Sequence, residues 1–532
     1  MGVIARQSIK GALANYMGVA IGFVTTFFVV TRFLTTEEVG LTRVMVDAAM
    51  LFSSLAALGG NSSLIKFFPH FKTNTRPRQP QAAATPSGLE GEYRETYHGI
   101  FGLSLLLPLA GFFLFALAFL IFREPILGMY SKNSPLLTNY FYLIPMLTFF
   151  ALYLTVFETG ASVLMRITVP KMVREVGIRV FNLAAYLLYG YKVIGLDAFV
   201  WLFCGSYGLA MLLNMFYLYR ISGMKLRDWL HVDWHFVKDG GRWKEMLFFT
   251  LFVTVIVLVG NIPLMSSLFL GAKTSLQMTG VYTIAFFIAN VVEVPYRSLG
   301  AISRPVIAAA VKDNNWVEVN RLGRQVSLHQ LMVSLLIFFV IAINIDTLFA
   351  LIPNGSSYAG GAIVVFILGM AKVMNSSLSI GTDILNYSRW YLLLLPLTVL
   401  LLVSAIYLNI KLIEVWDING AAAATLFSYG LYFLLLLMVL WIVLRVDVFS
   451  MGQLKVVVIM GAGFGLNWLW GQWIAPLVTG SMSGVGGMIV DSVVKTVVLG
   501  GLILVCIVGW KVSPTVNEIV RKAKNKELRI KH

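Results

Sequence analysis

The stretch YLLLLPLTVLLLVSAIYLN, residues 391–409, contains no charged side chain. A helix needs about 20 predominantly apolar residues to cross the hydrocarbon core of a bilayer, and this stretch meets that requirement. Similar stretches recur along the whole chain. Of its 532 residues 58% are hydrophobic and only 12% are charged, and the mean hydropathy is +0.82. Soluble domains carry about 25% charged residues. The sequence therefore predicts an all-α integral membrane protein.

Hydropathy along the chain predicts about fourteen spanning helices. Two of them, near 175–192 and 278–299, are interrupted by Arg179 and Glu293, so the sequence is compatible with twelve to fourteen spans. The predicted spans lie near residues 11–31, 40–64, 98–122, 139–162, 175–192, 197–219, 246–270, 278–299, 326–350, 361–384, 391–409, 418–442, 455–474 and 488–510.

The lysine and arginine residues predict the orientation of these spans. Cytoplasmic loops of membrane proteins are enriched in both residues. If the N-terminus is cytoplasmic, most basic residues fall in inner segments, and the outer turns keep only Arg32, Arg123, Lys132, Lys192, Lys273 and Lys411. We therefore expect both termini in the cytoplasm. The net charge of +16 is then explained by contact with anionic inner-leaflet lipids, without nucleic acid as a partner.

The segments between the predicted spans favour no catalytic chemistry. The outer turns are short, which leaves no room for an inserted enzyme domain. The polar segment 73–96 is predicted to be a flexible cytoplasmic loop, because its Pro, Gln and Ala content cannot bury a core. His231, Asp233 and His235 stand near one another, but further ligands at suitable spacing are lacking nearby, so we expect no metal. Cys204 and Cys506 lie in apolar runs and are expected to behave as small buried hydrophobes.

Two short motifs carry a resemblance to a known family. TRFLTTEEVGLTRV covers residues 31–44, after the first predicted span, and NSSLIKFFPHF covers 61–71. Glu37 and Glu38 favour the positive N-terminal end of the second span, and Gly40 is expected to permit a tight turn between helices. An Arg-x-Leu followed by an acidic turn and a glycine resembles the start of the polysaccharide and O-antigen flippases. These belong to the multidrug, oligosaccharidyl-lipid and polysaccharide exporter superfamily.

The resemblance implies two six-helix lobes around a central cavity, with two accessory helices. The lobes would cover 1–222 and 223–445, the accessory spans 446–510 and a basic cytoplasmic tail 511–532. A loose internal repeat is consistent with this duplication, because FLTTEEVGLTR at 33–43 has a counterpart in FLGAKTSLQMTGVYT at 269–283. The small residues of GAGFG, 461–465, are expected to form a helix contact.

Charged residues inside the predicted spans are the candidate site residues, because each costs free energy in hydrocarbon unless it faces a cavity or a partner. A spacing of four residues places Arg43 with Asp47, and Glu293 with Arg297, on a common helical face. Lys372 and Asp383 are eleven residues apart, three helical turns, and so also share a face. With the resemblance, Arg43, Arg297 and Lys372 are candidates to bind a pyrophosphate or an acidic sugar. Charge balance or ion coupling would fall to Asp47, Glu158, Glu293 and Asp383. Intrahelical pairing that only neutralises buried charge is the alternative, and we favour it for Asp491 and Lys495.

The resemblance implies a flippase that moves a lipid-linked oligosaccharide from the inner to the outer leaflet of the bacterial plasma membrane by alternating access. Its partners would be this substrate, membrane lipids and glycan assembly enzymes. No cofactor is expected, and the coupling ion, a proton or Na⁺, is left open. A cation-coupled multidrug exporter of the same superfamily is the alternative. A polysaccharide polymerase or glycosyltransferase is less expected, because such an enzyme would present large outer loops with carboxylates or histidines, and no histidine is predicted in an outer loop.

Overall fold

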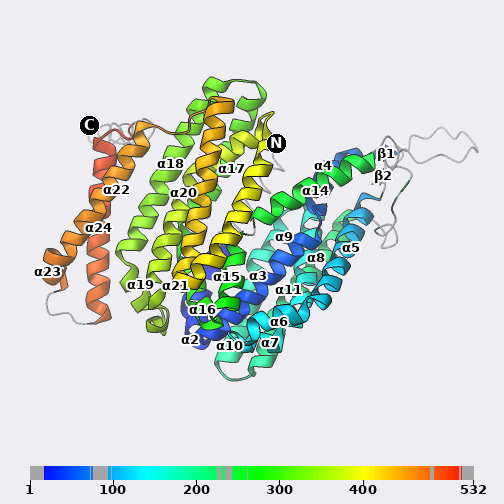
Figure 1. Cartoon of the computed structure of the whole chain (residues 1–532), viewed down its shortest axis with the longest axis horizontal. Coiled ribbons are helices and arrows are strands. Elements are labelled where there is room, and N and C mark those ends of the chain that lie inside the picture. The colour runs from blue at the N-terminus through cyan, green and yellow to red at the C-terminus, as the bar shows by residue number, and fades with distance from the viewer. Residues whose placement is uncertain are drawn as a thin grey trace, which may run out of the picture. The chain divides into compact units, whose positions relative to one another are not determined.

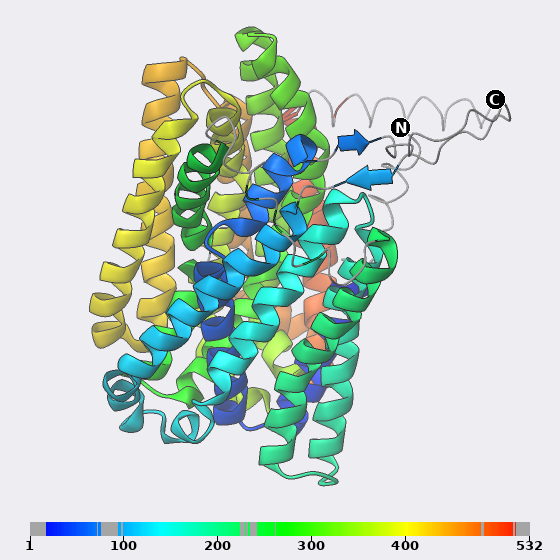
Figure 2. The same cartoon turned by 90° about the vertical axis from the view of Figure 1, so that its right-hand side faces the viewer.

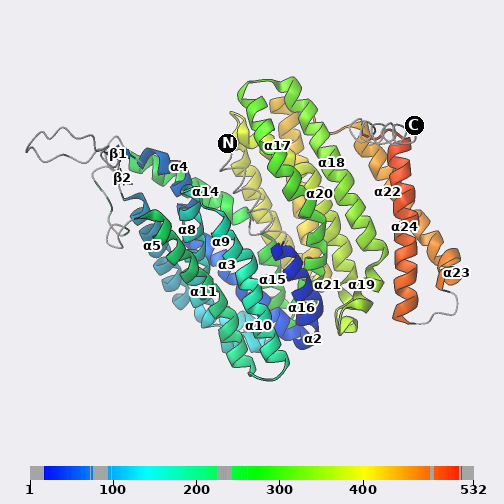
Figure 3. The same ribbon diagram turned by 180° about the vertical axis from the view of Figure 1, so that it is seen from behind.

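A computed structural model covers the whole chain. The structure describes residues 17–71, 73–75, 94–96, 99–223, 242–260, 262–479 and 484–513, together with the single residues 229, 232, 234 and 517. Nearly all of these residues are helical, as Figures 1 to 3 show from three sides. The predicted fold class, an all-α membrane protein, is confirmed.

The chain divides into two compact units. Unit 1 holds the described residues up to Leu34 and from Leu41 to Leu268, and unit 2 holds Thr35–Gly40 together with the residues from Phe269 onward. The chain passes between the units at Leu34, at Gly40 and at Leu268. The second of these crossings lies inside helix α3 (Thr36–Ala56) and the third inside helix α15 (Ile262–Lys273).

Unit 1 begins with the apolar helical stretch Met17–Phe33, which includes the π-helical turn η1 (Thr25–Val30) and the short α2 (Thr31–Phe33). The remainder of α3, the first part of α15 and the following elements complete the unit: α4 (Gly60–Phe71), β1 (Thr73–Thr75), β2 (Arg94–Thr96), α5 (Ile100–Ile121), α6 (Arg123–Ser131), α7 (Pro135–Tyr140), α8 (Leu143–Val163), α9 (Thr168–Met172), η2 (Val173–Gly177), α10 (Ile178–Gly190), α11 (Leu196–Ser222) and α14 (Arg242–Gly260).

Unit 2 follows in chain order with α16 (Leu276–Asn290), η4 (Val291–Glu293), α17 (Val294–Lys312), α18 (Trp316–Ile343), α19 (Ile345–Leu351), η5 (Gly355–Ser357), η6 (Ala359–Gly361), α20 (Ala362–Tyr387), η7 (Tyr391–Leu393), α21 (Leu394–Val439), η8 (Leu440–Leu444), α22 (Met451–Leu469), η9 (Trp470–Ile474), α23 (Ala475–Thr479) and α24 (Val485–Gly509).

Ten helices within the described ranges are long and apolar enough to cross a membrane. One of these stretches, Tyr391–Leu444, is 54 residues long and contains the eleventh and twelfth predicted spans. Asp417 separates them, because its backbone (φ 48°, ψ −126°) is not helical. The count of fourteen spans remains a prediction, whereas the multi-pass architecture does not depend on it.

The predicted flexible loop 73–96 is partly wrong. Its two ends form an antiparallel ribbon in which Thr73 pairs with Thr96 and Thr75 with Arg94. Figure 2 shows the two strands as a short ribbon beyond the helices. Backbone hydrogen bonding between the ends explains the difference, because composition alone does not register it. Residues 76–93 lie outside the described residues, as do the tail from 518 onward and the three residues His231, Asp233 and His235.

The two segments of the predicted internal repeat meet at a close helix crossing in unit 2. A Cβ atom added to Gly40 would lie 1.9 Å from the carbonyl oxygen of Leu276, and one added to Gly280 would lie 1.9 Å from that of Thr36. The contact is therefore reciprocal, with each glycine facing the first residue of the other helix. Gly40 lies inside α3, so the prediction that it forms a tight turn is wrong. Its hydrogen-sized side chain instead allows two backbones to touch.

Hydroxyl side chains begin both helices of this crossing. The backbone N–H of Glu38 donates to Thr35 Oγ1 (3.3 Å), and the N–H of Thr35 donates to Glu38 Oε2 (2.9 Å). This reciprocal pair is a capping box, which satisfies two otherwise free donors at a helix start. At α16 the N–H of Met278 donates to Ser275 Oγ (3.1 Å). Both starts thus share a capping hydroxyl followed five residues later by a glycine.

The accessory helices α22 and α24 pack against α18 in unit 2, and the two lie side by side in Figures 1 and 3. Gly463 carries the close contact predicted for GAGFG, because an added Cβ would lie 2.9 Å from Ile503 Cδ1. Gly461 and Gly465 have nothing within 4 Å of such an atom, so the prediction fails for them. Both point away from described neighbours.

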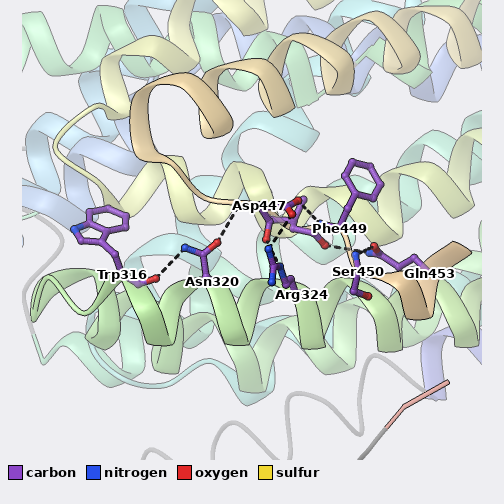
Figure 4. Close-up of polar contacts among 8 residues, drawn as sticks. Trp316, Asn320, Arg324, Asp447, Phe449, Ser450 and Gln453 are labelled. Atoms are coloured by element: carbon purple, nitrogen blue, oxygen red, sulfur yellow. Dashed lines mark hydrogen bonds and ion pairs between the residues drawn. The ribbon is translucent and has the colours of Figure 1, made fainter. Parts of the chain in front are cut away.

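The linker 445–450, between η8 and α22, is fastened to α18 by polar contacts (Figure 4). The N–H of Asp447 donates to Asn320 Oδ1 (2.8 Å), and Arg324 Nη2 donates to Asp447 Oδ2 (2.9 Å). Gln453 Nε2 then donates to Ser327 Oγ (2.7 Å) on α18. These bonds fix the start of the accessory pair to one face of α18.

Candidate functional site

A buried ion pair joins η4 to α20 in unit 2. Lys372 Nζ lies 3.2 Å from Glu293 Oε2, and the two side chains are only 5% and 9% exposed. Asn375 Nδ2 donates to the other carboxylate oxygen, Glu293 Oε1 (2.8 Å). The ammonium group also lies 5.1 Å from the ring centre of Phe286. Glu293 therefore has a donor on each oxygen, which offsets much of the cost of burying its charge.

Local structure explains how these groups meet. Glu293 ends the single 3₁₀ turn that interrupts the helical run from α16 to α17, and Pro295 is the second residue of α17. A proline at the start of a helix needs no backbone partner, so the break is tolerated there. Lys372 and Asn375 are three residues apart on α20 and so share one face. Both donors consequently reach the carboxylate at the break.

Lys372 and Asp383 lie on the same helix, as predicted, but they do not pair. Asp383 Oδ2 lies 3.0 Å from Arg304 Nε, and Arg304 Nη2 donates to the hydroxyl of Tyr296 (2.7 Å). The hypothesis that Lys372 neutralises Asp383 is therefore wrong. Helical periodicity finds residues on one face, but the partner across the helix interface decides the contact.

Arg304 is the residue that sequence reasoning missed. The eighth predicted span ends near residue 299, whereas α17 continues to Lys312 and so includes Arg304. The signal was present, because Arg297 and Arg304 are seven residues apart, two helical turns, within a largely apolar run. The side chain of Arg297 lies outside the described part of the chain.

Unit 1 holds a second buried acidic group. Asp47 on α3 is 2% exposed and accepts at the same oxygen, Oδ2, from Arg43 Nε (2.5 Å) and from Ser267 Oγ (2.5 Å). Arg43 and Asp47 thus form the intrahelical pair that their spacing allows. Ser267 comes from α15, 220 residues away, and periodicity gives no hint of it.

Glu158 has an arginine partner in unit 1 that the sequence did not suggest. Arg174 Nη1 lies 2.7 Å from Glu158 Oε2, and the side chains are 32% and 20% exposed. Glu158 does not end its helix, because α8 continues to Val163. Near it, Arg179 lies 3.3 Å from Glu175 and donates to the carbonyl oxygen of Gly18.

The accessory pair also contains an ion pair, as predicted. Lys495 Nζ lies 3.4 Å from Asp491 Oδ2, and Trp470 Nε1 donates to Asp491 Oδ1 (2.8 Å). These contacts tie α24 to η9. Among the described residues there is no group of three His, Cys, Asp or Glu side chains that could hold a metal.

Buried pairs of this kind are net neutral and stable only while both partners remain charged and in contact. An anion that replaces the carboxylate, or a proton that neutralises it, frees the cation for another partner. Lys372 with Glu293 and Arg43 with Asp47 are the pairs in which one group is almost fully enclosed.

The chain matches a known protein family in sequence and a solved structure in fold. A family model described as polysaccharide biosynthesis protein matches residues 4–310, more than half of the chain. The chain belongs to this family. Its fold is that of a lipid II flippase, MurJ, in an inward closed conformation, at a TM-score of 0.66 and 10% identity. The match covers 93% of this chain and 98% of MurJ.

Multidrug exporters share the same fold. A multidrug resistance transporter of the MATE family, in the MOP superfamily, matches at a TM-score of 0.53 and 16% identity over 81% of this chain and 97% of its own. A mutant of the Vibrio cholerae MATE transporter VcmN matches at 0.50 and 11% identity over 83% and 98%. No curated protein sequence matches this chain. The chain therefore shares its fold with these transporters.

Proposed function

We propose that the protein flips a lipid-linked oligosaccharide from the inner to the outer leaflet of a bacterial plasma membrane. The observation that carries the proposal is the family match over residues 4–310. The fold shared with a lipid II flippase over 93% of the chain supports it. A transporter of this kind needs no catalytic group, and we propose no enzymatic activity.

The substrate's diphosphate would exchange partners with buried carboxylates. Lys372 is held by Glu293 in the absence of substrate, and a diphosphate offers the same ammonium group a more highly charged acceptor. Glu293 would keep the bond from Asn375 and take up a proton or Na⁺ as its cationic partner leaves. Arg43 with Asp47 would act in the same way, and Arg297 would add a further positive charge.

The remaining acidic residues would keep the transport path neutral. Asp383 is paired with Arg304 and Glu158 with Arg174, so neither leaves an isolated charge in the membrane. The transport cycle would be alternating access, in which the lipid tail stays in the bilayer while the head group crosses. Glycan assembly enzymes would supply the substrate and consume the product.

Removing the protein from cells tests the proposal. We expect the lipid-linked glycan to accumulate on the inner leaflet and the corresponding surface polysaccharide to disappear. A plasmid copy of the wild-type gene should restore the surface glycan. Unchanged surface glycan in the deletion strain would contradict the proposal.

A cation-coupled multidrug exporter is the second candidate, and the fold shared with MATE transporters favours it. The same deletion strain distinguishes the two. An exporter predicts new sensitivity to cationic dyes with normal surface glycan, whereas a flippase predicts the loss of glycan with unchanged dye sensitivity.

A further inference from the structure

An apolar cavity of about 210 Å³ lies within unit 1, between α4, α5 and α14. Its walls include Leu64 from α4, Leu103 and Leu107 from α5, and Met246 from α14. None of the residues that line it carries a charge. All of the residues that line it belong to unit 1, and none of them takes part in the ion pair formed by Lys372.

The hydroxyl groups in the wall are already paired. Ser63 Oγ and Thr250 Oγ1 share a hydrogen bond of 2.6 Å, and Ser104 Oγ donates to the carbonyl oxygen of Phe101 (2.8 Å). A water molecule needs two to four polar partners to occupy a cavity, and apolar cavities remain dry. This cavity therefore favours a hydrocarbon occupant.

The rim of the cavity has a different chemistry. Trp243 and Leu247 are 45% and 51% exposed, and tryptophan is typical of the membrane–water interface. Lys66 lies three residues after the wall residue Ser63, on the same face of α4. Its ammonium group lies 4.3 Å from the ring centre of Phe249 and 3.0 Å from Glu245 Oε1.

We propose that this cavity binds one acyl chain of an anionic phospholipid, with the lipid phosphate at Lys66. The combination of a dry apolar cavity and an adjacent partly exposed ammonium group matches an amphiphile with a negative head group. The side chain of Lys66 is 40% exposed and that of its present partner, Glu245, is 63% exposed. A pair this exposed contributes little free energy, so a phosphate can displace the carboxylate.

A phospholipid fits this place better than the transported lipid does. A diphosphate linked to a glycan calls for several converging donors, whereas the rim presents Lys66, already shielded on one side by Phe249. The net charge of +16 also attracts anionic lipids of the facing leaflet. The bound chain would hold α4, α5 and α14 together as a structural lipid.

Photolabelling of the full-length protein tests the assignment. The protein is placed in nanodiscs of phosphatidylcholine that contain phosphatidylglycerol with a diazirine in its acyl chain. After irradiation, we expect labelled peptides from α4, α5 and α14. Unlabelled phosphatidylglycerol should compete for this labelling, and phosphatidylcholine should not.

Three variants sharpen the test. Ser104→Phe places a ring in the cavity and should abolish the labelling, whereas Leu117→Phe, on the same helix at a position 57% exposed, should leave it unchanged. Lys66→Gln leaves the cavity intact and should reduce the preference for phosphatidylglycerol over phosphatidylcholine about fivefold. Gel filtration and thermal unfolding establish that each variant is folded.

Several results would overturn the assignment. Labelling that survives Ser104→Phe, equal competition by phosphatidylcholine, or an unchanged lipid preference in Lys66→Gln would each do so. Competition by a polyprenyl diphosphate but not by phosphatidylglycerol would assign the cavity to the transported lipid instead. Glycan export is measured in a separate assay. A result that contradicts the lipid-binding proposal therefore leaves the flippase proposal standing, and the reverse also holds.

Discussion

Replacing Lys372 by alanine separates a substrate-binding role from a merely structural one. The substitution removes the ammonium group that pairs with Glu293. Among the described contacts, the buried carboxylate then keeps the hydrogen bond from Asn375. Breaking a buried ion pair by removing one partner costs about 3–5 kcal/mol, because the other charge stays in a low dielectric. We therefore expect Lys372→Ala to lower the unfolding temperature and the abundance of the protein in membranes.

The second substitution, Glu293→Gln, removes the orphaned charge. In the double variant Lys372→Ala with Glu293→Gln, the neutral amide can still accept from Asn375, so most of the lost stability should return. Asp383→Asn is the matched control, because Asp383 pairs with Arg304 and should not rescue Lys372→Ala. Lys372→Arg keeps the positive charge and should retain part of the activity.

The assay is surface glycan per unit of folded protein, measured in the deletion strain for each variant, with thermal unfolding in detergent alongside. If Lys372 binds the substrate, the double variant is stable but exports no glycan. Recovery of both stability and export in the double variant would refute the binding role.

Three further predictions follow from the packing and the topology. Gly280→Val should destabilise the protein by about 1–3 kcal/mol, because its side chain would overlap a backbone oxygen, whereas Gly430→Val, with nothing within 4 Å of an added Cβ, should have little effect on thermal unfolding. Arg304→Gln should cost about 1–3 kcal/mol in the same measurement, because its carboxylate partner is mostly buried; stability equal to wild type would contradict the pairing. Cysteine at Ser356 should react with a membrane-impermeant thiol reagent in intact cells and cysteine at Asn314 should not; the reverse pattern would invert the predicted orientation.

Local patterns in the sequence were sufficient to predict the architecture and the short-range contacts. Hydropathy predicts the spanning helices because the bilayer requires about 20 apolar residues in a helix that crosses it. The pair Arg43 and Asp47 was predictable because residues four apart on a helix are neighbours whatever surrounds them. The same reasoning predicted Asp491 with Lys495.

Contacts between helices were not predictable in this way. Glu293 and Lys372 are 79 residues apart, and which of several charged faces they present to one another depends on how η4 rotates the chain after α16. A single 3₁₀ turn changes the direction in which the following side chains point, and a hydropathy profile does not predict such a turn. Asp383 was therefore assigned to the wrong partner. Arg304 was missed because the end of a membrane span was taken as the end of its helix.

The placement of α3 in both units has a mechanical consequence. Its first turn belongs to unit 2 and the rest to unit 1, and α15 likewise continues through the other helical crossing at Leu268. A loop would let one unit turn with little resistance, whereas a continuous helix transmits torque and stores bending energy. At the crossing in α3, Gly40 packs directly against the backbone of Leu276, so a bend of α3 at this point would press on the first turn of α16.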